Sequence, residues 1–287
     1  MKVFVYGTLR KGERNAYHLN DATYLHGNAW AEGTLYDTGH GYPVMFLNHS
    51  HNASDIVYGE VYDIDMDILG SIDKLEGYIP GRTNNLYERV KARVYTDDGV
   101  LDDVITYVAG ETLQHSENII PLGDWKVYTY LQKSELLYFA YGSCMDDERF
   151  KQAHVDQYFK DILGRGVLNG YHMQFSRSTT DGGKADIAES INAITEGVIY
   201  RIPIEAVDYL YKREGVHTKG YRPSVVTVSC AENPYDVLTF IGLDKQPETP
   251  PTNLYATEII RGATGILSED YMEQVKDKIK KLMARNR

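Results

Sequence analysis

The sequence predicts two α+β domains in tandem, and three observations lead to this prediction. The chain has 287 residues, which is long for one average domain and sufficient for two. Several strand-like runs and few helical ones occur in each half. The strands and turns of the first half also recur in the same order in the second half.

Composition narrows the class of protein. The chain is 43% hydrophobic and 25% charged, which is typical of an ordinary globular protein. Its 30 basic and 41 acidic residues give a net charge of -11, which argues against binding nucleic acid or acidic membrane surfaces through bulk electrostatics. The apolar run Val3–Val5 is too short for a signal peptide, and no segment approaches about 18 apolar residues. We therefore predict a cytoplasmic protein with no nucleic-acid or membrane partner.

Cysteine usage suggests neither a disulfide framework nor a metal site. Cys144 and Cys230 are the two cysteines, and neither has the close Cys and His neighbours that zinc needs. We therefore expect no metal.

The repeat begins with a buried strand that runs into a Tyr-Gly turn, at residues 3–8 and again at 137–143. Further along each half, a glycine in a strand (Gly59 or Gly197) is followed by a short helical pattern that ends in Glu-Gly. The interval from Gly59 to Glu76 is 17 residues, and so is the interval from Gly197 to Glu214. Equal spacing in both halves indicates a duplicated unit.

Strand patterns resume after each Glu-Gly, at residues 87–94 and 104–108 in the first half and at 221–228 and 236–241 in the second. A final helix is predicted after Ser268, which we expect to cap its first turn. The polar segment Lys133–Glu135 separates the halves, so we place the domains at 1–133 and 135–287.

Each glutamate continues the apolar face of its helix. In the second half we expect a helix that opens with Pro203, and Leu210 lies four positions before Glu214. Leu69, Ile72 and Glu76 repeat this spacing. Both helices should end at the following glycine, Gly77 or Gly215, because glycine accepts the left-handed conformation.

This placement suits the glutamates to proton transfer. The negative end of the helix dipole and loss of solvent both raise the pKa of a carboxyl group towards neutrality. The turns Tyr6-Gly7-Thr8-Leu9 and Tyr141-Gly142-Ser143-Cys144 could offer backbone N–H groups to an anion. An isolated helix-end glutamate usually reaches into water, and a Tyr-Gly pair is usually an ordinary turn. Two matched copies favour a functional site.

These motifs resemble the γ-glutamylcyclotransferase superfamily over nearly the whole chain, as two successive copies. The first half, with residues 5–12 and Tyr42-Pro43, resembles the branch of AIG2-like proteins and γ-glutamylamine cyclotransferases. The second half resembles γ-glutamylcyclotransferase proper, on residues 138–143, Gly182-Gly183, Glu214-Gly215, Gly220-Tyr221, Pro251, Tyr255, Gly262 and Tyr271.

The resemblance implies that each domain is a small mixed or antiparallel sheet that curls into a partial barrel with flanking helices. It also implies cofactor-free cyclisation of a γ-glutamyl amino acid, peptide or amine to 5-oxoproline, with release of the amine. Glu76 and Glu214 would be the catalytic acid/base residues. The substrate-binding residues would be Tyr6, Gly7, Thr8, Leu9 and Tyr87 in the first domain, and Tyr138, Phe139, Ala140, Tyr141, Gly142, Ser143, Tyr221 and Tyr255 in the second.

One departure from the family leaves alternatives open. Cys144 stands where the family commonly has asparagine, so a weak donor replaces an amide. The chain could therefore be a binding or sensor module for γ-glutamyl metabolites, or one active domain beside a structural copy. Whether it is a monomer or a homodimer is open.

Overall fold

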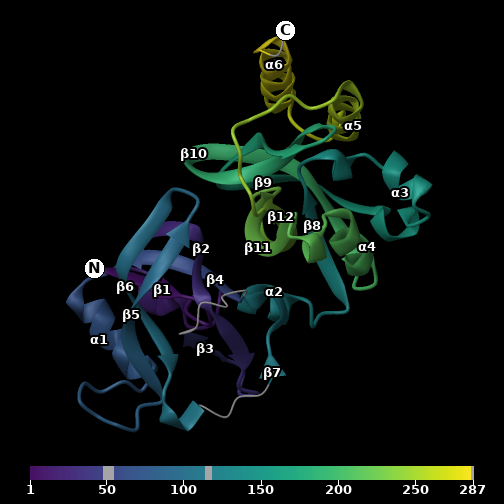
Figure 1. Cartoon of the computed structure of the whole chain (residues 1–287). Coiled ribbons are helices and arrows are strands. Elements are labelled where there is room, and N and C mark those ends of the chain that lie inside the picture. Colours follow the sequence, from purple (N-terminus) through teal and green to yellow (C-terminus); the bar gives the residue numbers. More distant parts are fainter. Residues whose placement is uncertain (48–54, 114–117, 286–287) are drawn as a thin grey trace. The chain divides into compact units, whose positions relative to one another are not determined.

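The structure, a computed structural model, describes residues 1–47, 55–113 and 118–285. The chain divides into two compact units, Met1–Tyr128 and Thr129–Arg287, which we call unit 1 and unit 2 (Figure 1). The domain boundary expected at residues 133–135 stays a prediction. Each unit combines helices with a sheet that closes on itself, so the predicted α+β class is confirmed.

Unit 1 is built on a five-stranded barrel. Its strands are β1 (Lys2–Val5), β2 (Thr23–Asp37), β3 (Pro43–Leu47), β4 (Ile56–Asp63), β5 (Tyr87–Thr96), β6 (Gly99–Ala109) and β7 (Asn118–Ile119). Helix α1 (Met66–Leu75) follows β4, and α2 (Trp125–Tyr130) spans the division between the units; short 3-10 helices occupy Ala16–Leu19, Glu111–Leu113 and Pro121–Gly123. The strand order is β3-β2-β4-β1-β6-β5, with β7 beside β2. A further pairing of β2 with β5 closes the barrel.

Unit 2 contains a closed barrel in the order β10-β8-β12-β11-β9. Its strands are β8 (Glu135–Ala140), β9 (Asp161–Thr179), β10 (Gly182–Pro203), β11 (Tyr221–Cys230) and β12 (Asn233–Gly242). Its helices are α3 (Glu148–Gln152), α4 (Ala206–Arg213), α5 (Asn253–Ala263) and α6 (Glu269–Arg285), with 3-10 helices at Ser143–Met145, Asp156–Phe159 and Val216–Thr218. The N–H of Tyr271 donates to Ser268 Oγ at 3.3 Å, so Ser268 caps α6 as predicted.

The two barrels share one plan. In unit 1, β1 pairs antiparallel with β4 and parallel with β6. In unit 2, β8 pairs antiparallel with β10 and parallel with β12. Helix α1 follows β4 just as α4 follows β10 (Figure 1). The repeat predicted from the sequence is therefore a repeat of the fold.

Helix α1 begins and ends for clear local reasons. The Asp65 carboxylate accepts hydrogen bonds from the N–H groups of Asp67 and Ile68 at 3.0 and 2.9 Å, which caps the first turn. Ile72 is fully buried on the inner face. The helix ends at Leu75 with Glu76 as its C-cap residue, and Gly77 follows with a φ of +65°.

Helix α4 starts later than predicted. It begins at Ala206, and Pro203 is the last residue of β10, opposite Glu135. A proline has no N–H to donate, so it fits the end of a strand as readily as the start of a helix. The other end matches the prediction, because Glu214 is the C-cap residue of the helix and Gly215 follows with a φ of +62°.

Strand β1 is buried on both faces. Val3 and Val5 pack with Ile72 of α1, whereas Phe4 packs in a second cluster with Val61 of β4. Strand β4 pairs with β1 and passes very close to it. At Gly59 of β4 an added Cβ would lie 2.4 Å from the carbonyl oxygen of Val5.

Unit 2 repeats this contact. An added Cβ at Gly197 of β10 would lie 2.3 Å from the carbonyl oxygen of Ala140 and 2.6 Å from the Phe139 ring. The glycine of each half is therefore required by the packing of the first strand.

We expect Gly59→Ala to destabilise unit 1 by about 2 kcal/mol or more, because a backbone oxygen cannot move aside for the new methyl group. Gly70→Ala is the matched control, since no atom lies within 4 Å of its added Cβ. It should stabilise helix α1 by about 0.5–1 kcal/mol. Trp30 and Trp125 both lie in unit 1, so tryptophan fluorescence during chemical denaturation follows this unit. Equal midpoints for Gly59→Ala and wild type would contradict the packing argument.

Candidate active site

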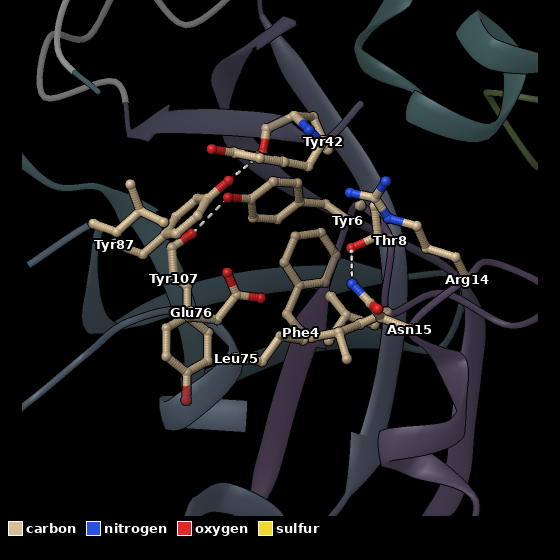
Figure 2. Close-up of a pocket in the computed structure, with 15 residues that line it drawn as sticks. Phe4, Tyr6, Thr8, Arg14, Asn15, Tyr42, Leu75, Glu76, Tyr87 and Tyr107 are labelled. Atoms are coloured by element: carbon tan, nitrogen blue, oxygen red, sulfur yellow. Dashed lines mark hydrogen bonds between the residues drawn. The ribbon is translucent and has the colours of Figure 1, made fainter. Parts of the chain in front are cut away.

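Unit 1 holds a cavity of about 230 Å³ between the end of β1, the end of α1 and the start of β5. All the site residues predicted for the first half line it: Tyr6, Gly7, Thr8, Leu9, Glu76 and Tyr87. The other lining residues are Phe4, Val5, Arg14, Asn15, Tyr42, Pro43, Leu75, Leu86 and Tyr107 (Figure 2).

The Tyr-Gly turn is held tightly against its surroundings. An added Cβ at Gly7 would lie 2.8 Å from the ring of Pro43, so only glycine fits there. Asn15 Nδ2 donates to Thr8 Oγ1 at 3.0 Å, and the Asn15 N–H donates to the Thr8 carbonyl at 3.0 Å. Within the described residues, the N–H groups of Thr8 and Leu9 have no acceptor. They are backbone donors that belong to residues of the cavity wall.

A buried ion-pair network anchors the chain just after this turn. Arg10 Nη1 lies 2.7 Å from Asp124 Oδ1, and Arg10 Nε lies 3.2 Å from Glu60 Oε1. The other oxygen of Glu60 accepts a hydrogen bond from the Lys11 N–H at 2.8 Å. All three charged side chains of the network are buried. Breaking one partner would leave an uncompensated buried charge, so the network fixes the position of the turn.

Tyrosine hydroxyls brace the cavity wall. The Tyr6 hydroxyl donates to the Tyr107 carbonyl at 2.8 Å and accepts from the Met45 N–H at 3.2 Å. The Tyr87 hydroxyl donates to the Pro43 carbonyl at 2.7 Å. Burial raises the pKa of Tyr6 and of Tyr87 well above the ordinary value. Both phenols therefore remain neutral and keep a fixed orientation.

Glu76 is the acidic residue of this cavity. Its N–H donates to the Ile72 carbonyl at 2.9 Å, and its carbonyl accepts from the Tyr87 N–H at 3.3 Å, so the backbone is fixed from both sides. The side-chain carboxylate has no hydrogen-bond or ion-pair partner among the described residues, and Figure 2 shows it directed into the cavity. Burial raises its pKa to about 7. It can accept and return a proton near neutral pH.

The cavity of unit 2 has only about 40 Å³, which is room for a few water molecules. Its lining residues are Tyr138, Phe139, Tyr141, Gly142, Ser143, Cys144, Ala185, Glu214, Tyr221, Thr239, Phe240 and Tyr255. Of the residues predicted for the second site, only Ala140 does not line it.

The framework of the second site matches that of the first. The Tyr141 hydroxyl donates to the Phe240 carbonyl at 2.6 Å, as Tyr6 does to Tyr107. The Tyr221 N–H donates to the Glu214 carbonyl at 3.2 Å. In addition, Tyr221 donates through its hydroxyl to the Ala185 carbonyl at 2.7 Å. The two sites therefore share the hydrogen bonds that hold the Tyr-Gly turn and the helix-end glutamate.

Two side chains engage the second glutamate and the turn beside it. The Cys144 thiol donates to Glu214 Oε1 at 3.2 Å, while Arg213 Nε donates to Cys144 Sγ at 2.8 Å. Arg213 Nη2 also donates to Ser143 Oγ at 3.1 Å. Leu9 and Leu75 occupy the corresponding positions in unit 1, and neither can bond to a carboxylate.

These contacts also change the titration of the second glutamate. Burial raises the pKa of Glu214, and the positive charge of Arg213 and the bond from Cys144 oppose that rise. Burial raises the pKa of the Cys144 thiol to about 11, so the thiol keeps its proton and remains a donor.

The sequence did not identify four residues as part of the sites. They are Arg14, Asn15 and Tyr107 of the first cavity and Arg213 beside the second. Arg213 directly precedes Glu214, as Leu75 precedes Glu76, so comparing the two copies at that position could have found it. Arg14 and Asn15 had no comparable signal, because their positions depend on how the loop after β1 folds back.

Within residues 1–47, 55–113 and 118–285, no group of three or more His, Cys, Asp or Glu side chains is placed to hold a metal ion. No helix in that part of the chain is long and apolar enough to cross a membrane.

Both units therefore contain the same kind of domain. It is a barrel whose first strand ends in a Tyr-Gly turn, with a helix-end glutamate beside that turn. The sequence profile described as "Gamma-glutamyl cyclotransferase, AIG2-like" matches residues 3–127, and that of the "AIG2-like family" matches residues 195–275. The chain belongs to the AIG2-like γ-glutamylcyclotransferase family, with two family domains in tandem.

Similar proteins match nearly the whole chain or less than half of it. YkqA of Bacillus subtilis (strain 168), whose name gives γ-glutamylcyclotransferase as a provisional activity, is 40% identical over 277 residues, 96% of this chain and 95% of YkqA. The crystal structure of YkqA matches with a TM-score of 0.87 and 38% identity, covering 98% of each chain. The γ-L-glutamyl-butirosin B γ-glutamyl cyclotransferase of Niallia circulans is 36% identical over 129 residues, 44% of this chain and 76% of that enzyme.

The raised pKa of Glu76 predicts a pH-dependent loss of stability. The folded state binds a proton more tightly than the unfolded state, whose carboxyl has the ordinary value of 4.5, so stability falls as pH rises from about 4.5 to about 7. The Glu76→Gln variant carries no carboxylate, so its folding does not bury a negative charge at high pH. At pH 8 it should be more stable than wild type by up to about 3 kcal/mol, and at pH 4.5 the difference should be small.

Denaturation followed by tryptophan fluorescence measures this difference in unit 1. Glu214→Gln is the control, since its site lies in unit 2 and the fluorescence reports unit 1. The same stability difference between Glu76→Gln and wild type at both pH values would show that the carboxyl of Glu76 titrates normally.

Proposed function

We propose that unit 1 is a γ-glutamylcyclotransferase that acts on a γ-glutamyl amino acid, peptide or amine. The α-amino nitrogen of the substrate attacks its own γ-carbonyl carbon and forms the bond that closes a five-membered ring. The bond from that carbon to the leaving nitrogen then breaks. The products are 5-oxoproline and a free amine, and together they contain all the atoms of the substrate, so the reaction needs no water and no electron transfer.

The observation that carries this proposal is the unpartnered carboxylate of Glu76 inside the larger cavity. In the proposed reaction Glu76 takes the proton from the α-ammonium group, which frees the nitrogen to attack. It then gives a proton to the departing nitrogen. A pKa of about 7 allows both transfers at neutral pH with little cost in either direction.

The Tyr-Gly turn supplies the other half of the proposed site. The N–H groups of Thr8 and Leu9 have no acceptor among the described residues, so they are available to the oxygen of the γ-carbonyl as it gains negative charge. The neutral rings of Tyr6 and Tyr87 shape the wall. Because both reacting groups belong to one molecule, the enzyme has only to hold the substrate in its folded conformation.

The small second cavity favours one active unit beside a structural copy. Glu214 is bonded to Cys144, and Arg213 lies 3.8 Å from its carboxylate, so the group that should move a proton is already engaged. A cavity of about 40 Å³ also leaves no space for a glutamyl group. We therefore assign turnover to Glu76 and not to Glu214.

We expect Glu76→Gln to lower kcat for 5-oxoproline release by about 100-fold or more, because the amide cannot accept the proton. Glu214→Gln should leave the rate within about twofold of wild type. The assay measures 5-oxoproline from γ-glutamyl amino acids, γ-glutamyl amines and glutathione. Loss of activity in Glu214→Gln alone would transfer the proposal to unit 2. No release from any of these compounds, with binding intact, would favour a binding module.

The pH profile gives a second test of the same role. Since Glu76 must be ionised to accept a proton, kcat/KM should rise with pH through an apparent pKa near 7. Initial rates of 5-oxoproline formation between pH 5 and 9 measure this limb. A rise centred near 4.5 would mean that the catalytic carboxyl titrates as it does in water, which contradicts the role of a buried Glu76 with a raised pKa.

A further inference from the structure

The first cavity contains one positive side chain, and its position bears on which substrates fit. Arg14 and Glu76 are the two charged residues among those that line the cavity. Arg14 is exposed, so it lies at the mouth of the cavity. The carboxyl of Glu76 is shielded from water, and this burial raises its pKa. Figure 2 shows the two side chains on different sides of the cavity. They form no ion pair with each other within 4.0 Å.

Arg14 also differs from the other arginines of unit 1. Arg10, Arg89 and Arg93 each pair with a carboxylate, and Arg82 donates to Asn84. Within the described residues Arg14 has neither an ion pair nor a hydrogen-bond partner. Its guanidinium lies near Gly41, where an added Cβ would be 3.3 Å from Nη1. The charge therefore lies beside the cavity and is available to a ligand.

Unit 2 also has an arginine at the corresponding sequence position, but its surroundings differ from those of Arg14. Arg14 lies five residues after Leu9, and Arg149 lies five residues after Cys144. Arg149 Nε is bonded to Glu258 Oε1 at 2.8 Å and does not line the second cavity.

We propose that Arg14 selects substrates whose leaving amine carries a carboxylate, which are γ-glutamyl amino acids and peptides. This inference rests on the proposed function. The reacting atoms must lie near Glu76, so the leaving amine extends towards the mouth, where Arg14 stands. A guanidinium binds a carboxylate in a charge-assisted pair. The chain has a net charge of -11, which repels an anionic substrate, so a positive group at the entrance has a clear effect on capture.

The test compares two substrates of nearly equal shape, γ-glutamylalanine and γ-glutamylalaninamide, which differ in the charge of the leaving group. Wild type should prefer γ-glutamylalanine by about tenfold in kcat/KM. Arg14→Gln should lose that preference through a higher KM for γ-glutamylalanine, with little change in kcat and little change for the amide. Arg14→Lys should restore part of the preference. Arg93→Gln, which removes an exposed arginine outside the cavity, should behave as wild type.

Two results would overturn the inference while leaving the proposed function intact. An equal loss on both substrates in Arg14→Gln would mean that Arg14 binds the α-carboxylate of the glutamyl group. No loss on either would mean that the guanidinium stays in solvent.

If wild type releases 5-oxoproline from neither compound, the proposed function fails for this class. Calorimetric binding then decides the role of Arg14. Tighter binding of γ-glutamylalanine than of the amide, lost in Arg14→Gln, supports the inference. Equal binding, or none, overturns it.

Discussion

The first strand of each barrel is in close backbone contact with a second strand, and a glycine makes this contact possible. At Gly59 and Gly197 the backbone passes so close to the carbonyl oxygen of Val5 or Ala140 that no side chain fits. This contact fixes how closely β1 and β8 pack against the neighbouring strand. It therefore fixes the position of the Tyr-Gly turn at the end of each. The helix that follows the glycine-bearing strand ends at the glutamate, whose carbonyl bonds to the next strand. One backbone constraint thus places both halves of the candidate site.

The side chains at two corresponding positions give the two glutamates different surroundings. Leu9 and Leu75 leave the carboxylate of Glu76 without a partner and leave space around it. Cys144 and Arg213 occupy the same positions in unit 2, where they bond to each other and to the glutamate or the turn. The apolar pair in unit 1 therefore leaves the carboxylate without a hydrogen bond. In unit 2 the thiol of the polar pair donates one to it.

The parts of the molecule that could be predicted from the sequence are those governed by local spacing. The equal interval between glycine and glutamate follows from a shared strand and helix, and it located Glu76 and Glu214 correctly at their helix ends. Pro203 was placed wrongly because proline suits both a helix start and a strand end. The size of each cavity could not be predicted, since it depends on contacts between side chains far apart in the sequence, such as that of Arg213 with Cys144, 69 residues away. The place of Arg14 depends likewise on a loop with no regular pattern.

The network of Arg10, Glu60 and Asp124 has a consequence for behaviour on heating. Burying charges costs free energy because water solvates them well, and that hydration becomes less favourable as temperature rises. The desolvation cost of the network therefore decreases with temperature, while the hydrophobic contribution per unit of buried area levels off. The segment that carries the Tyr-Gly turn is thus held by the type of contact that loses least in warm conditions, and its geometry should outlast that of loops held by apolar contacts alone.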